Sequence, residues 1–426
     1  MRSVMRWLVI VVVMVHGVIH LLGAAKGFGW ADVTQLREPI SMALGVAWLG
    51  AAMLVIVAGV LLLLWDRRSW VAAGVAAIVS EGVILSSWSD AKAGTVANVI
   101  LLGAAVYGFA SQGPTSYRAE FRRRAGVALT GPRPGGVVTE ADLAHLPEPV
   151  AAYVRRTGAV GKPRVTNVKA RIRGRIRAGA TSRWMSFTGE QLNTYGPEPT
   201  RLFFLDATMF GLPVDVLHTF VGPSATMRVK ACSLVPIVST AGPDMDRAET
   251  VTLFNDLCIL APAALIDAQI SWRLVDVHHV SGAFTNGAHT VSAELLFNEK
   301  HDLVDFVSND RLRASRDGKS FTRQRWSTPV HGYRTMDSRR ISTKGEARWH
   351  ASEPEGEFAY IQLDLDKITY NVPAALTEST RIGQSGAHAG VPQRHSRRHF
   401  APLVAQEDDP VAEGPRLGET QVDPGV

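Results

Sequence analysis

The chain has 426 residues, of which 46% are hydrophobic and 20% are charged, and its formal net charge is +6. This length allows two or three domains, and the hydrophobic residues are concentrated in parts of the chain rather than spread evenly. The two cysteines, Cys232 and Cys258, are too few for a disulfide framework and lack the spacing of a metal knuckle.

Four long apolar segments occupy the first quarter of the chain. A helix needs about 20 mostly apolar residues to cross a bilayer. The segments that meet or approach this length are residues 7–25, 39–65, 70–88 and 95–110, and tryptophans stand at several of their ends. We therefore predict a four-helix transmembrane domain over residues 1–112 of a multi-pass membrane protein.

The flanks of these segments predict their orientation. A cleaved signal peptide is the alternative for the first segment, but its apolar run is long and contains His16 and His20. Short cytoplasmic flanks carry an excess of lysine and arginine. One side holds Arg2, Arg6, Arg67, Arg68, Arg118, Arg122, Arg123 and Arg124, and the other holds Lys26, Arg37 and Lys92. We predict an inner (plasma) membrane protein whose N-terminus and soluble domain face the cytoplasm.

The sequence after the apolar segments predicts a soluble domain. Residues 113–138 form a basic linker rich in glycine and proline, and residues 139–157 have the apolar spacing of one amphipathic helix capped by Thr139. Residues 139–373 are predicted to be rich in β-structure, and residues 374–426, which are polar and rich in glycine and proline, are predicted to be disordered.

Alternation of polar and apolar residues begins near residue 165 and predicts a series of strands. They cover residues 168–177, 201–207, 225–230, 271–277, 289–298, 303–308, 320–327, 338–344 and 358–370. Short turns join them, which is typical of an antiparallel sheet, so we predict an α+β protein with a half-barrel or sandwich after the helices. One apolar stretch, residues 250–268, predicts one or two short helices interrupted by Pro262.

The first candidate site lies in the apolar helices. His16 and His20 are four residues apart and share one helix face, and Glu81 lies near the middle of the third segment. Ionisable groups at that depth are costly and usually face the interior of a bundle. The three side chains are predicted either to bind a metal or a haem or pass a proton, or to form interhelical hydrogen bonds with Glu81 paired to a histidine.

The second candidate site is a basic face on the first strand. It consists of Lys169, Arg171, Arg173, Arg175 and Arg177. Three partners for this charge are open: the lipid surface of the membrane, a polyanion, or acidic residues of this chain. Gln362, Asp364 and Asp366 share one face of the last strand, which is the strand expected beside the first. Aromatic residues do not alternate with the basic ones, so no nucleic acid is expected as a partner.

The third candidate site is a polar cluster around the interrupted helix. We predict a ligand-binding site from Glu249, Asn255, Asp256, Arg311 and Trp326, with Asp310 nearby. The alternative is that these residues are turn caps and a buried ion pair. Cys258 lies beside the cluster and is expected to be a small buried hydrophobic residue rather than a nucleophile.

Several catalytic motifs are missing from the sequence. It contains no phosphate-binding loop, no dinucleotide-binding glycine turn, no His-Glu-x-x-His motif and no Gly-x-Ser-x-Gly elbow. The sequence therefore favours a protein that is not an enzyme, and it identifies no catalytic residue and no cofactor.

Several short stretches resemble a family of bacterial four-helix membrane proteins that carry a C-terminal β-rich domain of unknown function. The matching stretches are HGVIHLLG (16–23), KGFG (26–29), PIS (39–41), WSDAKAGT (88–95), LPEPV (146–150), WMSF (184–187), EQ (190–191), NDLC (255–258), APA (261–263) and RWSTP (325–329). The resemblance implies a multi-pass membrane protein and transfers no activity and no catalytic residue to this chain.

Two looser resemblances concern the separate parts. The helices are similar in number and size to DoxX-type membrane proteins, some of which assist redox chemistry at quinones. The soluble part resembles lipoprotein-carrier half-barrels, which hold acyl chains on a concave sheet. We therefore expect membrane lipid and a small hydrophobic ligand as partners of a membrane-anchored binding module. A redox or ion-handling accessory protein centred on the intramembrane histidines is the alternative, and a scaffold whose tail recruits partners is a third possibility.

Overall fold

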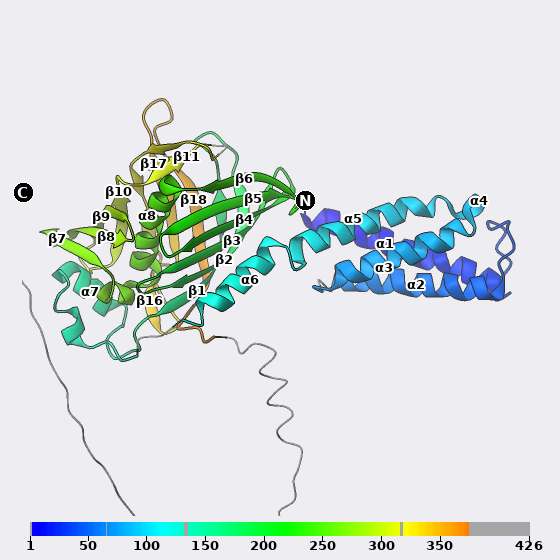
Figure 1. The fold of residues 1–426 in the computed structure, drawn as a ribbon, viewed down its shortest axis with the longest axis horizontal. Helices are drawn as coiled ribbons and strands as arrows, with labels where there is room; N and C mark the ends of the chain where they lie inside the picture. The colour runs from blue at the N-terminus through cyan, green and yellow to red at the C-terminus, as the bar shows by residue number, and fades with distance from the viewer. Residues whose placement is uncertain (1, 65, 132–134, 316–317, 375–426) are drawn as a thin grey trace, which may run out of the picture. The chain divides into compact units, whose positions relative to one another are not determined.

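The computed structural model describes residues 2–64, 66–131, 135–315 and 318–374. Helices come first along the chain, and a large sheet that curves around one buried helix follows (Figure 1). Within the described residues every strand pair is antiparallel, which confirms the predicted α+β class. The predicted disorder of the tail concerns residues outside the described ones, apart from residue 374.

Seven α-helices precede the first strand in the described chain, whereas the sequence predicted a bundle of four. They are α1 (Arg2–Gly27), α2 (Met42–Leu63), α3 (Ser69–Leu85), α4 (Trp88–Ala91), α5 (Gly94–Gln112), α6 (Tyr117–Ala128) and α7 (Glu148–Arg156). The long apolar helices α1, α2, α3 and α5 coincide with the four predicted segments. Helix α4 is a single turn before α5, and α6 lies within the segment that we predicted to be a linker.

The single helix predicted over residues 139–157 is wrong, because two separate elements occupy that range. A 3-10 helix, η1 (Glu140–Leu143), begins at the Thr139 cap, and α7 begins only after Pro147. Proline lacks a backbone N–H and disfavours a helical conformation in the residue before it. The chain therefore breaks at Pro147 and starts again.

Three helical stretches of the described chain are long and apolar enough to cross a membrane. They are Met5–Gly27, Met42–Leu63 and Gly94–Ala128. The helix α3 is also apolar but has 17 residues, which is shorter than a typical span. These helices are candidate spans by length and composition.

Small residues let α1 and α2 approach each other closely. A Cβ atom added to Gly27 would lie 2.6 Å from the Cα atom of Gly45, and one added to Gly23 would lie 2.2 Å from the Trp48 ring. Both distances are too short for real atoms, so these positions require glycine. Close contact through small residues is typical of helices that associate within membranes.

The strands form one sheet of 14 strands together with two short hairpins. The main order is β6-β5-β4-β3-β2-β1-β18-β17-β13-β10-β9-β8-β7, and β14 pairs with β17. The bounds are β1 (Asn167–Ile176), β2 (Met185–Thr194), β3 (Thr200–Met209), β4 (Leu212–Val221), β5 (Ser224–Ala231), β6 (Val235–Ala241), β7 (Ile270–Asp276), β8 (His279–Asn286), β9 (His289–Phe297), β10 (Leu303–Ser308), β11 (Leu312–Ala314), β12 (Phe321–Arg323), β13 (Trp326–Ser327), β14 (Val330–His331), β15 (Arg334–Met336), β16 (Arg339–Ile341), β17 (Lys344–His350) and β18 (Glu357–Tyr370).

Several strand predictions need correction. Strands β2, β4, β6, β8, β11, β14 and β15 were not predicted, and neither was most of β17. The strand predicted over residues 320–327 is divided into β12 and β13, and the one predicted over 338–344 is β16 followed by the start of β17. The prediction over 250–268 is closer: α8 (Pro243–Leu260) and η2 (Pro262–Ile266) are separated at Pro262, but α8 begins seven residues earlier than predicted.

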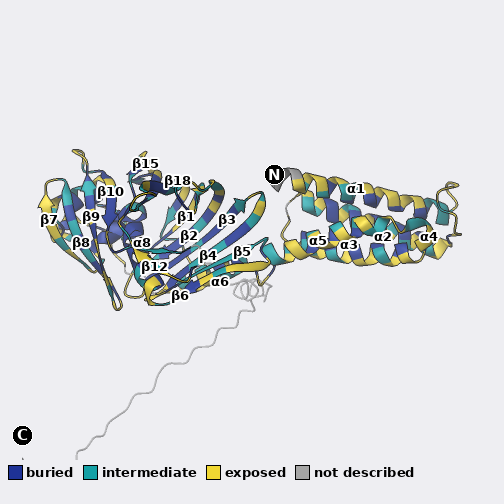
Figure 2. Ribbon diagram, turned by 90° about the horizontal axis from the view of Figure 1, so that it is seen from above, coloured by how far each residue is buried: buried dark blue, intermediate teal, exposed yellow. Residues whose placement is uncertain are grey.

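The helix α8 fills the concave side of the sheet. Its side chains Val251, Leu253, Phe254 and Leu257 are buried in a core shared with most of the strands and with α7. In Figure 2 the strands carry buried and exposed residues in alternation, and α8 is mostly buried. The sheet therefore buries one face against α8.

The helix α6 packs against the opposite, convex face of the sheet. Tyr117 and Phe121 of α6 form a second core with Leu192, Leu202 and Phe204, which point away from α8. Arg118 of α6 also contacts Asp206 of β3 at 3.2 Å. Burial of the two aromatic rings fixes the start of the β-rich part to the end of the last candidate span.

Candidate functional site

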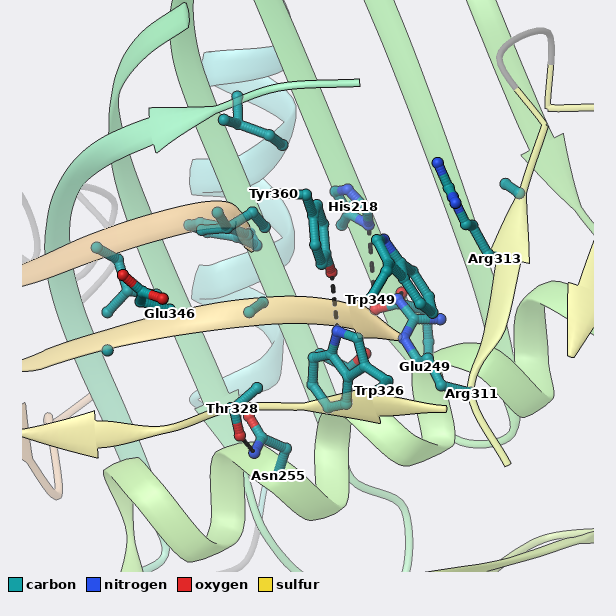
Figure 3. A pocket seen from close by; sticks show the side chains of 18 of the residues that line it. His218, Glu249, Asn255, Arg311, Arg313, Trp326, Thr328, Glu346, Trp349 and Tyr360 are labelled. Atoms are coloured by element: carbon teal, nitrogen blue, oxygen red, sulfur yellow. Dashed lines mark hydrogen bonds and ion pairs between the residues drawn. The ribbon is translucent and has the colours of Figure 1, made fainter. Parts of the chain in front are cut away.

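A cavity of about 690 Å³ lies between α8 and the concave face of the sheet. All five residues of the predicted ligand-binding cluster line it: Glu249, Asn255, Asp256, Arg311 and Trp326. Figure 3 shows four of them, Glu249, Asn255, Arg311 and Trp326, close to His218 and Tyr360. Asp310 is not among the lining residues, because it bonds with Arg247 and the backbone N–H of Ser292. The structure thus gathers the predicted cluster around one space.

The helix α8 presents one face to the cavity. Met245, Glu249, Thr252, Asp256 and Ile259 all line it, and their spacing of three or four residues places them on the same side of a helix. The two carboxylates therefore point into the cavity together. Pro243 starts the helix at a position where its missing N–H does no harm, and Pro262 ends the segment.

A buried arginine, Arg201, and a partly buried one, Arg311, balance the two carboxylates. An Arg201 nitrogen lies 3.1 Å from Glu249 Oε2, and Arg201 Nε lies 2.7 Å from Asp256 Oδ2. Arg311 contacts the other oxygen, Glu249 Oε1, at 3.0 Å. Burial disfavours the charged form of Glu249, but Arg311 and Arg201 outweigh it and hold the pKa of Glu249 below its ordinary value. Glu249 therefore stays ionised, and the cluster sets two carboxyl groups against two guanidinium groups.

Two amides complete the cluster from β2. Gln191 Nε2 donates to Asp256 Oδ2 at 2.6 Å, and Asn193 Nδ2 donates to the same oxygen at 3.0 Å. Both amides point towards α8 because they alternate with the convex-face residues of the strand. Buried charges are tolerated when they are paired and hydrogen-bonded, and this arrangement meets that requirement for Asp256.

Two polar atoms of the cavity wall have no hydrogen-bond partner among the described residues: Arg311 Nε and His218 Nδ1. His218 Nδ1 is 4.0 Å from Glu249, which is too long for a hydrogen bond. Burial lowers the pKa of His218 to about 4, so its imidazole is neutral at pH 7. Buried polar atoms without partners are rare, and here they offer a donor from Arg311 and an imidazole nitrogen to whatever fills the cavity.

The rest of the wall is largely apolar. It includes Ile172, Phe187, Phe203, Met227, Ile259, Phe321, Trp349 and Leu363. Trp326 and Tyr360 add aromatic surface, with their polar ends bonded to each other: Trp326 Nε1 donates to Tyr360 OH at 3.2 Å (Figure 3). A mostly apolar cavity with a few placed polar groups is the usual form of a small-molecule site.

Cys258 is fully buried and does not line the cavity. Tyr153 OH donates a hydrogen bond to its carbonyl oxygen at 2.9 Å. Burial raises the pKa of the Cys258 thiol well above its ordinary value, so the thiol stays protonated and is a poor nucleophile.

The sequence did not indicate Arg201, His218, Gln191, Asn193 or Tyr360 as site residues. Arg201 and His218 lie on strands next to each other, but 17 residues separate them in the chain, and β4 was not predicted at all. The one feature of the sequence that could have indicated a site is a polar residue on the buried face of a strand, and Gln191 and Asn193 are such residues. Without the position of β2 that signal is ambiguous.

The basic face of β1 is largely occupied by this chain's own acceptors. Strand β18 lies beside β1, as predicted for the pairing alternative. Arg173 contacts Asp366 at 2.8 Å, and Arg175 Nε donates to Gln362 Oε1 at 2.6 Å. Arg177 Nε donates to a backbone carbonyl. Lys169 and Arg171 are exposed on β1 and lie beside Glu190 of the neighbouring strand β2. Contact of this face with a membrane surface stays a prediction.

The histidines of α1 take part in a hydrogen-bonded group between helices. His16 Nε2 lies 3.1 Å from Ser80 Oγ and 3.0 Å from Asn98 Oδ1. His20 Nε2 lies 2.7 Å from Ser80 Oγ and 3.3 Å from His16 Nε2. These contacts join α1, α3 and α5, which agrees with the interhelical alternative for the two histidines.

Glu81 does not join the histidines, contrary to both predictions for it. Its two oxygens accept hydrogen bonds from Thr95 Oγ1 at 2.9 Å and Asn98 Nδ2 at 2.7 Å. Glu81 follows Ser80 directly on α3, so its side chain leaves the helix about 100° away from that of Ser80. Among the described residues no group of three His, Cys, Asp or Glu side chains is placed to hold a metal ion. The structure thus does not bring the three predicted metal ligands, His16, His20 and Glu81, together around one point.

A second cavity, of about 480 Å³, lies beside the two histidines. His16, His20, Gly23, Trp48 and Asp90 are among the residues that line it, and most of the others are apolar. The histidines thus face open space as well as each other.

Comparisons with known proteins identify a family for the β-rich part. The model of a family of unknown function (DUF6544) matches residues 136–363, more than half of the chain. No match was found among curated protein sequences.

Two solved structures resemble the chain. A DUF1329 family protein from Desulfovibrio piger is 11% identical, with a TM-score of 0.33, and the match covers 55% of this chain and 95% of that one. A putative outer membrane lipoprotein-sorting protein domain from Vibrio parahaemolyticus is 9% identical, with a TM-score of 0.29, covering 51% and 91%. Similarity at this level carries no functional argument.

Proposed function

We propose a ligand-binding function for this chain, which belongs to a family of unknown function (DUF6544). The β-rich part holds a mostly apolar, lipid-like molecule in the cavity beneath α8, and the apolar helices anchor that part at a membrane. The observation that carries the proposal is the 690 Å³ cavity, whose apolar wall is interrupted by one buried polar cluster. Its volume lies within the usual range for small-molecule sites.

The polar cluster indicates the chemistry of the ligand. Arg201 and Arg311 are already balanced by Glu249 and Asp256, so the cluster has no surplus charge to neutralise a strongly charged ligand. The free Nε–H of Arg311 requires a hydrogen-bond acceptor. A long apolar body with a carbonyl, ester or hydroxyl oxygen near one end fits both conditions.

Photo-crosslinking in the full chain tests this proposal. The probe is an uncharged monoacylglycerol that carries a diazirine on its acyl chain, added to the detergent-purified protein. We expect cross-links to peptides of α8, β3 and β18. A Thr252→Trp variant should lose them, because Thr252 lines the cavity and an indole would occupy it, whereas Thr252→Val should keep them.

Either of two results would overturn the proposal. One is the absence of cross-links to cavity peptides in the wild-type chain. The other is cross-linking in Thr252→Trp that equals the wild type while its thermal unfolding shows an intact fold.

The placement of the chain in the plasma membrane, with the β-rich part in the cytoplasm, is part of the same proposal. It is supported by the three candidate spans together with the shorter apolar helix α3, and by the excess of lysine and arginine on one side of these four helices. A cysteine at the exposed Glu198, in a Cys232→Ser background, reports the side. A membrane-impermeant maleimide should label it only after cell lysis, and labelling in intact cells would contradict the orientation.

A second candidate function, redox or ion handling by the helices, is favoured by one observation. His16 and His20 line the 480 Å³ cavity, so a bound organic molecule would contact two imidazoles there. Solvent extraction and a visible absorption spectrum of the purified full chain test it. A chromophore that is lost in His20→Ala supports it, and a colourless protein that releases nothing extra relative to His20→Ala contradicts it.

A further inference from the structure

Two neighbouring hairpins end in exposed apolar side chains. The β3–β4 turn carries Phe210 and Leu212, which are 76% and 55% exposed, and the β5–β6 turn carries Leu234 and Val235, which are 48% and 57% exposed. The two turns touch, since the backbone N–H of Cys232 donates to the Pro213 carbonyl oxygen at 2.7 Å. We call these four side chains the tip patch. Exposed apolar groups that cluster in this way usually mark a contact surface.

One border of the opening of the large cavity, the β1–β2 loop, lies at the same end of the sheet as the tip patch. Strands β1 to β6 are consecutive antiparallel neighbours, so the β1–β2 loop, the β3–β4 turn and the β5–β6 turn share one end. Of the four cavity-lining residues that are exposed in the described chain, three come from the β1–β2 loop and the β11–β12 hairpin. They are Ala178, Ser320 and Thr322; the fourth is Lys344. The loop that borders the opening therefore stands beside the tip patch.

The polar cluster lies towards the other end of the cavity. Arg201 is the second residue of β3, whose last residue, Met209, adjoins the tip patch. His218 is likewise far along β4 from its start at Leu212. A molecule entering near the tip patch would pass Arg177 and the Arg313–Glu355 pair beside the β1–β2 loop and would reach the Glu249 cluster last.

The chain itself ties this end of the sheet to a candidate membrane span. Helix α5 ends at Gln112, and Tyr117, the first residue of α6, follows after four residues. Five extended residue steps cover at most about 18 Å. The Tyr117 ring lies 4.9 Å from the guanidinium of Arg228 and 4.5 Å from Lys230 Nζ, and Lys230 is two residues before Cys232 in the β5–β6 turn. The tip patch is therefore held close to the end of α5.

We propose that the tip patch enters the surface of a lipid bilayer and places the cavity opening against the lipids. Four apolar side chains next to Arg228 and Lys230 suit an anionic bilayer, in which apolar groups reach the acyl chains and basic groups stay among the headgroups. The membrane is then both the anchor of the chain and the source or destination of the ligand. This second part rests on the proposed function.

The test uses the full chain reconstituted into vesicles of phosphatidylcholine and phosphatidylglycerol. An environment-sensitive dye is attached to Cys232, which lies in the β5–β6 turn, while Cys258 is fully buried and out of reach of the reagent. Lipids with a spin label on the upper acyl chain report depth, and aqueous iodide reports exposure. The control places the dye on Glu198→Cys in a Cys232→Ser background, at the opposite end of the sheet.

We expect the spin-labelled lipid to quench the dye at Cys232 several-fold more than the dye at Glu198→Cys, with the reverse order for iodide. Leu234→Glu with Val235→Glu should abolish the lipid quenching. Val275→Glu with Val277→Glu is the matched control, because these residues are similarly exposed at the other edge of the sheet, and it should change nothing. Iodide quenching of the dye at Cys232 that equals its quenching at Glu198→Cys overturns the proposal. A dye at Cys232 whose emission shifts to the blue but is not quenched by the spin-labelled lipid also overturns it, because that result indicates a protein partner.

A transfer experiment separates this inference from the proposed function. The probe, the same diazirine-bearing monoacylglycerol, is supplied either in detergent or within the vesicles. The Leu234→Glu, Val235→Glu variant should cross-link normally at the cavity in detergent and at least several-fold less from vesicles. Equal cross-linking from vesicles overturns the inference alone, and no cavity cross-linking in detergent, even in the wild type, overturns the proposed function.

Discussion

The buried ion pairs of Glu249 give the sharpest stability prediction. Glu249 is 3% exposed, and its two oxygens contact Arg201 and Arg311 at 3.1 and 3.0 Å. Glu249→Gln keeps the shape but leaves Arg311 without its carboxylate partner and turns an amide N–H₂ towards a guanidinium. Removing one partner of a buried ion pair costs about 3–5 kcal/mol.

Hydrogen exchange measured by mass spectrometry on the full chain in detergent reports this loss. Since about 1.4 kcal/mol is a factor of ten, amides of α8 should exchange about a hundred-fold to a few thousand-fold faster in Glu249→Gln. The matched control is Glu357→Gln, whose carboxylate is paired with Arg348 but 48% exposed, and which should change exchange little. Adding Arg311→Met to Glu249→Gln should restore part of the protection, because it removes the stranded charge.

The pH dependence gives an independent check of the same cluster. The pKa of Glu249 is lowered in the folded protein. The ionised carboxylate therefore contributes to the free energy of unfolding above the pKa of an ordinary glutamate, and this contribution is lost as the pH falls through the pKa of Glu249 in the folded protein. Glu249→Gln should therefore lose stability at neutral pH and little at acid pH. If Glu249→Gln exchanges within about three-fold of Glu357→Gln at pH 7, the carboxylate is not buried between two arginines and the reasoning fails.

Three further predictions concern other parts of the chain. Burial raises the pKa of Asp305 to about 6, so its contribution to stability is present at acid pH and lost as the pH rises through 6. Asp305→Asn should therefore be more stable than the wild type at pH 7, and its unfolding temperature should change less between pH 4 and 6. Gly23→Ala should lower the thermal stability of the helices by about 1–3 kcal/mol, because its Cβ would overlap the Trp48 ring. Gly50→Ala, whose Cβ meets open space, should not, and equal effects of the two variants would contradict the packing of α1 against α2. Arg173→Gln should change unfolding by less than about 1 kcal/mol, because Arg173 is exposed despite its contact with Asp366, and a larger loss would show that the basic face of β1 is a structural network.

The sequence predicted those elements whose pattern is local. Apolar runs long enough for a membrane identified α1, α2, α3 and α5, because nothing else in a protein requires such composition over that length. Alternation identified β1, whose apolar side faces the core and whose basic side is exposed. Pro262 marked the end of α8 because a proline cannot donate the hydrogen bond that continues a helix.

What the sequence did not predict depends on contacts between distant residues. Strand β2 carries the polar residues Gln191 and Asn193 on its buried face, and their inward position is understandable only once Asp256 is known to lie opposite. Arg201 and Arg311 are 110 residues apart and meet only at Glu249. Glu81 was assigned to the histidines by depth in the membrane alone, whereas the angle between neighbouring side chains on α3 directs it to Thr95 and Asn98.

Native mass spectrometry of the full chain, purified in detergent without added ligand, tests the central claim most directly. The account predicts an apolar molecule of defined mass that stays with the wild type and Thr252→Val and is lost from Thr252→Trp. Lipid bound around the helices would be the same in all three proteins, so only the difference between them counts. A wild-type chain whose bound molecules are identical in mass and amount to those of a folded Thr252→Trp variant would contradict the claim that the cavity under α8 is a ligand site.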